Sequence, residues 1–166
     1  KFKGRKSCQQ VADNSAQTSP KFSEDDLNER DDEGNTSLIT AVENGDTEVV
    51  QLLLDKGADI ETENYDGSTA LIWAAANGHT EVVKLLLDKG ANIQARNVHG
   101  HTALVMAAAY DRTEVVQLLL DNGADIEAEG FDGQTALSHA EGQGHEELVK
   151  ILKKAASVRN SNKSPE

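Results

Sequence analysis

Residues 65–97 read YDGSTALIWAAANGHTEVVKLLLDKGANIQARN, and the stretches on both sides are variations of this unit. Glycine recurs at a constant interval, at Gly34, Gly67, Gly100 and Gly133, and a threonine and a leucine follow each of them at fixed offsets. A period of about 33 residues predicts a repeat array, in which each unit buries its apolar face by stacking on its neighbours. The chain is therefore expected to be an all-α solenoid.

Each unit carries signals for one turn and two short helices. Asp66-Gly67 is a turn pair, since glycine takes positive φ at little cost. Thr69 is placed to cap a first helix, which Gly78 ends in the left-handed conformation. A second helix is predicted from about residue 80 to 88, and it is apolar on most sides. A helix of this length is only marginally stable in isolation, so it is expected to lie inside a stack of helices.

The ends of the array depart from this pattern. Lys153 and Glu141 stand at positions that are apolar in the earlier units, which is typical of a capping repeat. The predicted repeat domain covers residues 23–156, with units at about 32–64, 65–97, 98–130 and 131–156. Residues 24–33 are either the trailing loop of an incomplete unit or one helical turn capped by Ser23. Residues 1–22, which are basic, and residues 157–166 are predicted to be disordered tails.

Composition and charge exclude several classes of function. The chain carries a formal charge of −13, and residues 23–156 hold nine basic and 27 acidic residues, or −18. Such a segment lacks the basic footprint that nucleic acid requires, so a basic or polar partner is expected. No apolar run approaches the length of a membrane span. The single cysteine, Cys8, allows no disulfide within the chain. A cytoplasmic monomer is expected; because the chain begins with Lys1, a processed or secreted form is the alternative.

The repeats closely resemble the ankyrin repeat, a turn followed by two helices with T-P-L-H-x-A at the start of the first helix. The matching stretch of the second unit begins Thr69-Ala70-Leu71-Ile72, and Gly78-His79 and Gly90-Ala91-Asn92 follow it. The proline and the histidine of the signature are missing in all four units. In the third unit Asp111 and Arg112 replace the Gly-His pair, which predicts a looser or strained turn there.

The resemblance implies stacked helix-turn-helix units with projecting β-turn tips. It also implies a non-catalytic module that binds another protein on a concave surface made by the tips and the first helices. Carried over position by position, the predicted partner-binding residues are Arg30, Asp32, Glu33, Glu43, Glu63, Tyr65, Asp66, Trp73, Asn77, Arg96, His99, His101, Tyr110, Glu129, Phe131 and Asp132. Tyr65, Tyr110 and Phe131 are expected to lie along one groove as anchors inside an acidic rim. The alternative for Tyr65 and Phe131 is packing between adjacent tips.

Chemistry on this surface is not predicted. His99 and His101 are one residue apart on a tip, and with Asp66 or Asp132 they could begin a zinc site; solvated histidines are the preferred interpretation, and no metal or cofactor is expected. His79 and His145 are assigned to turn support. No phosphate-binding loop or catalytic constellation is present in the sequence. The leading hypothesis is a binding module; an enzyme inhibitor or regulatory subunit and a structural spacer are the alternatives.

Overall fold

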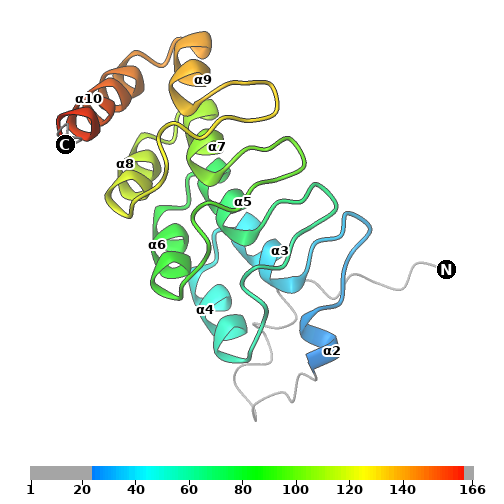
Figure 1. The fold of residues 1–166 in the computed structure, drawn as a ribbon. Helices are drawn as coiled ribbons and strands as arrows, with labels where there is room; N and C mark the ends of the chain where they lie inside the picture. Colours follow the sequence, from blue (N-terminus) through cyan, green and yellow to red (C-terminus); the bar gives the residue numbers. More distant parts are fainter. Residues whose placement is uncertain (1–23, 163–166) are drawn as a thin grey trace.

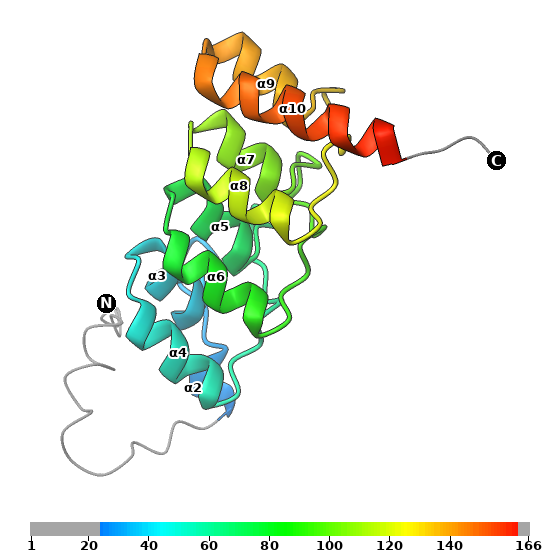
Figure 2. The ribbon, with the colours of Figure 1, turned by 90° about the vertical axis from the view of Figure 1, so that its left-hand side faces the viewer.

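The computed structural model describes residues 24–162, in which the helices form a two-layered stack (Figure 1). The first-helix layer consists of α3 (Ser37–Glu43), α5 (Ala70–Asn77), α7 (Ala103–Ala109) and α9 (Ala136–Gln143). The second-helix layer consists of α4 (Thr47–Asp55), α6 (Thr80–Asp88), α8 (Thr113–Asp121) and α10 (Glu146–Asn162). Long loops project beside the first layer, and Figure 2 views the molecule from the side of the second layer. The predicted all-α solenoid is confirmed.

The predicted capping residue and the predicted helix-ending glycine both bound α5 in the structure. Thr69 accepts a hydrogen bond from the backbone N–H of Ile72, and Gly78 ends α5 with φ 77°. The second helix of this unit begins at Thr80 and ends at Asp88, as predicted. Asp111 takes φ 56° at the position of Gly78, so the third unit keeps the same turn with a residue for which it is costly.

The core lies between the layers and is built from repeated positions. Leu53, Leu86, Leu119 and Leu152 stand at the same place in the four second helices, and each is at most 1% exposed. Alanines fill the first helices, which lets neighbouring units approach closely. Neighbouring first helices pack on one another, and each first helix also packs on the second helix of its own unit. Stability therefore depends on stacking rather than on any single unit.

At the two ends of the array, one of the predicted alternatives is observed at the first and one prediction was wrong at the last. The first element, α2 (Glu24–Leu27), is one helical turn, and Leu27 is buried against the first unit. At the other end Glu141 and Lys153 are exposed and form an ion pair of 2.8 Å, which fits a capping surface. The predicted disorder was wrong for residues 157–162, because α10 continues to Asn162. The guanidinium of Arg159 donates to the carbonyl oxygen of Ala124 at 2.6 Å and so ties this last part of α10 to the array.

The predicted basic tail, residues 1–22, lies outside the described residues, as do Cys8 and Ser23. Within residues 24–162 no helix is both long and apolar enough to cross a membrane.

Candidate functional site: the row of turn tips

The projecting tips are built by side chains that bond their own backbone. Asn64 Oδ1 accepts hydrogen bonds from the N–H groups of Asp66 and Ser68, both at 3.0 Å. Asn97 does the same for His99 and His101. These bonds fold the loop into a compact turn with a glycine in the left-handed conformation at its end, such as Gly67 at φ 68°.

Backbone hydrogen bonds join the tips to one another. The N–H of Tyr65 donates to the carbonyl oxygen of Glu33 at 3.2 Å, that of Val98 to Asp66 at 3.0 Å, and that of Phe131 to His99 at 2.9 Å. Each bond joins equivalent positions of consecutive units, so the same contact recurs between every pair of described tips. The four tips therefore form one continuous row.

Three apolar side chains lie on this row. Tyr65, Val98 and Phe131 occupy the same position in three successive tips and are 70%, 53% and 80% exposed. Their rings or methyl groups also touch the preceding tip: a Cβ added to Gly34 would lie 2.6 Å from the Tyr65 ring, and one on Gly100 would lie 3.0 Å from the Phe131 ring. The alternative predicted for Tyr65 and Phe131, packing between adjacent tips, is observed, and both side chains still expose most of their surface.

The structure does not place Tyr65, Tyr110 and Phe131 along one groove, contrary to the prediction. Tyr110 is the residue that follows α7, at the opposite end of that helix from the tip. The seven residues of α7 separate it from the tip by roughly 10 Å along the helix axis. Tyr110 is exposed there, beside the helix ends that carry Glu43 and Asn77 in earlier units. Trp73 is half-buried within α5, and its indole N–H has no hydrogen-bond partner among the described residues.

The two arginines of the predicted site serve the tips themselves. Arg96 donates to the carbonyl oxygens of Gly100 and Glu129, at 3.0 and 2.6 Å. Arg30 makes the corresponding bonds to Gly34 and Glu63 in the first unit. Both guanidinium groups therefore brace one tip against the next.

Acidic side chains surround the apolar row. The members on or beside the tips are Asp32, Glu33, Glu63, Asp66, Glu129 and Asp132, and all are exposed or half-exposed. The pKa of Asp132 lies below its ordinary value, chiefly because its carboxylate accepts a hydrogen bond from the N–H of Gln134. The tips thus present negative charge next to apolar surface.

A second row of contacts fastens the units at the other end of the first helices. Arg112 Nε donates to the carbonyl oxygen of Ala76 at 2.9 Å. A ring nitrogen of His79 lies 3.0 Å from the carbonyl oxygen of Glu43, and one of His145 lies 3.4 Å from that of Ala109. The assignment of these two histidines to turn support is confirmed, and Arg112 takes the same role in the third unit.

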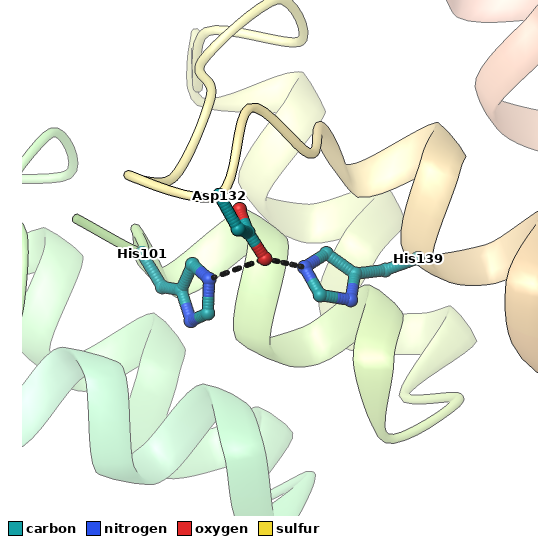
Figure 3. Close-up of side chains that lie close together, drawn as sticks. All are labelled: His101, Asp132 and His139. Atoms are coloured by element: carbon teal, nitrogen blue, oxygen red, sulfur yellow. Dashed lines mark ion pairs between the residues drawn. The ribbon is translucent and has the colours of Figure 1, made fainter. Parts of the chain in front are cut away.

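The histidines of the third tip point in different directions. His99 Nε2 lies 3.5 Å from a carboxylate oxygen of Asp66. His101 Nε2 lies 3.7 Å from Asp132 Oδ2, and His139 Nε2 of α9 lies 3.9 Å from the same oxygen (Figure 3). The preferred interpretation of solvated histidines was wrong for His101, because its Nε2 is buried in a cluster of His101, Asp132 and His139.

Two residues of this surface, Val98 and His139, are not among the predicted partner-binding residues. Val98 was detectable, because it stands exactly one repeat period after Tyr65 and one before Phe131. His139 shares the first-helix position of Trp73 and Met106, but its contact with the ring of His101 joins two units and is not contained in the repeat period.

A protein-family model for ankyrin repeats matches three overlapping stretches, residues 9–97, 56–130 and 94–165. No curated protein matches the chain significantly. The family match covers most of the sequence and agrees with the observed helices and tips. The chain therefore belongs to the ankyrin-repeat family.

Proposed function

We propose that the chain binds a protein partner carrying basic and apolar side chains along its row of turn tips. Ankyrin repeats are generally protein–protein interaction modules and are typically non-catalytic. The observation that carries the more specific proposal is the exposure of Tyr65, Val98 and Phe131 at one position of three successive tips. Exposed apolar side chains that recur in this way are suited to anchor a partner.

The charges beside the row support a basic partner. Six carboxylates lie on or beside the tips, whereas Arg30 and Arg96 direct donors to backbone carbonyl oxygens. Negative charge around an apolar strip steers a positively charged partner toward it and disfavours acidic ones. The proposed surface thus combines an apolar strip suited to hold a partner with an acidic surround suited to attract one.

Preorganisation is the third supporting feature. The backbone bonds between tips and the arginine braces hold the apolar residues in place before a partner arrives. A surface that is already ordered loses little conformational entropy on binding, so more of the contact energy appears as affinity.

The test is selection of binders from a displayed peptide library on the full chain, followed by surface kinetics of the selected peptides. Tyr65→Ser, Val98→Ser and Phe131→Ser, separately and together, remove the apolar strip. Val158→Ser is the matched control, since Val158 is 55% exposed but lies on α10, away from the tips. Glu63→Gln tests the role of charge.

Each anchor substitution should weaken binding by about 2 kcal/mol, or roughly thirtyfold, mainly through faster dissociation. Glu63→Gln should chiefly slow association and reduce its dependence on salt. Selected peptides should be rich in Lys and Arg with interspersed apolar residues. Peptides that bind the triple variant as tightly as the unaltered chain would show that the tips are not the binding surface.

A further inference from the structure

The cluster of His101, Asp132 and His139 contains ring nitrogens that the fold leaves without partners. Nε2 of His101 and Nε2 of His139 are both buried, and neither has a hydrogen-bond partner among the described residues. Both face Asp132 Oδ2, at 3.7 and 3.9 Å, which is too long for a hydrogen bond (Figure 3). Buried polar atoms are nearly always hydrogen-bonded, so two ring nitrogens that converge on one carboxylate without a hydrogen bond are available to a shared ligand.

Deviations from the repeat pattern bring these groups together. His101 stands where the second tip has Ser68, whose hydroxyl bonds Asp66 within its own tip. Gly130 stands where the two preceding tips have a buried asparagine. A Cβ at Gly130 would lie 2.4 Å from His101 Cδ2, so the imidazole occupies space that glycine alone leaves open.

The third group also breaks the pattern. His139 stands in α9 where the earlier first helices have Thr40, Trp73 and Met106. The rings of His101 and His139 meet edge to face with centroids 5.3 Å apart. The residue changes at positions 101, 130 and 139 thus converge on one point beside Asp132.

The donor set matches the preferences of one class of cation. One ring nitrogen of each histidine and one carboxylate oxygen of Asp132 all lie within 4.8 Å of one another. Zn²⁺ binds imidazole nitrogen and carboxylate oxygen at about 2.0–2.2 Å, which puts ligand atoms about 3.3 Å apart in a tetrahedral site. Small side-chain rotations that draw the ligand atoms toward a common centre would complete that geometry.

We propose that His101, Asp132 and His139 bind a divalent cation of the zinc type, with the fourth position open to water or to a donor from a partner. The site does not depend on the proposed partner binding. Nε2 of each imidazole lacks a hydrogen-bond partner among the described residues, so both ring nitrogens are available as ligands. The carboxylate of Asp132 supplies the negative charge.

The proposal is tested by isothermal titration of Zn²⁺ into the full chain carrying Cys8→Ser, because a thiolate would also bind zinc. His101→Ser and His139→Met introduce the residues that the second and third units carry at these positions, so the stack should tolerate them. His99→Ser is the matched control, since this imidazole lies two positions before His101 in the sequence but faces Asp66. Circular dichroism checks that each variant is folded, and Co²⁺ replaces Zn²⁺ as a visible spectroscopic probe.

One Zn²⁺ per chain is expected, together with a Co²⁺ spectrum typical of tetrahedral coordination. His101→Ser and His139→Met should each reduce zinc affinity by at least about tenfold, because each removes a ligand, whereas His99→Ser should leave it unchanged. The absence of saturable binding, or equal affinity in all variants, would overturn the proposal.

Discussion

Replacing Leu86 by alanine tests the stacking that holds the array together. Leu86 is fully buried in α6, which packs against α5, α4 and α8. The substitution removes three carbon atoms, which at about 0.8 kcal/mol each amounts to about 2.4 kcal/mol of lost burial. The cavity left between helices adds to this, so the expected loss of unfolding free energy is about 2.5–5 kcal/mol. Urea unfolding should show the loss as a fall in the midpoint of about 1–2 M at an unchanged slope.

The matched control is Leu87→Ala, the same substitution one residue later. Leu87 is half-buried, so fewer of its atoms leave water on folding and the loss should be less than about half that of Leu86→Ala. Lys153→Ala in the capping unit removes only an exposed ion pair with Glu141 and should cost less than about 1 kcal/mol. Equal losses at Leu86 and Leu87 would refute the assigned register of the second-helix layer.

Three further predictions concern the glycine pattern and the histidine cluster. Gly130→Ala should lower the unfolding free energy measured in urea by about 1–3 kcal/mol, because its Cβ would collide with the imidazole of His101. Gly142→Ala lies in open space within α9 and should raise the unfolding free energy by about 0.5–1 kcal/mol. A change of the same sign in both variants would contradict this reasoning. Asp111→Gly should raise the thermal midpoint by relieving about 1 kcal/mol of left-handed strain, and a lowered midpoint would count against it. The lowered pKa of His139 means that the unfolded chain binds more protons than the folded one below about pH 6.5. Stability measured with a chelator present should therefore fall as the pH drops below that value, and this fall should be smaller in His139→Met; identical pH profiles would exclude such a role for His139.

The fold was predictable because its signals are local and repeated. Thr69 and Gly78 bracket α5 by their own backbone preferences, and equivalent signals recur in the other units. The end of α10 was not predictable in this way. Residues 157–162 contain no glycine or proline to stop a helix, and Arg159 is held by Ala124, which belongs to the preceding unit.

The candidate site was predictable only in part. The period assigned Tyr65 and Phe131 to the tips, and the signals that bracket α7 already separated Tyr110 from them, so the prediction of one groove did not use the length of this helix. The cluster of His101 and His139 depends on the missing side chain of Gly130 and on side-chain orientation. Such a convergence arises from tertiary packing, which a one-dimensional pattern does not contain.

Two rows of contacts between units limit how far the array can bend. One row is the set of backbone bonds between tips, and the other is the set of side-chain bonds between helix ends. They lie at opposite ends of the first helices, so bending the array one way stretches one row and compresses the other. The two rows together therefore hold the distance between neighbouring tips constant. A partner whose apolar groups recur at a different interval would have to leave a tip unused or deform both rows. Selectivity should therefore extend to the spacing of groups along the partner as well as to their chemistry.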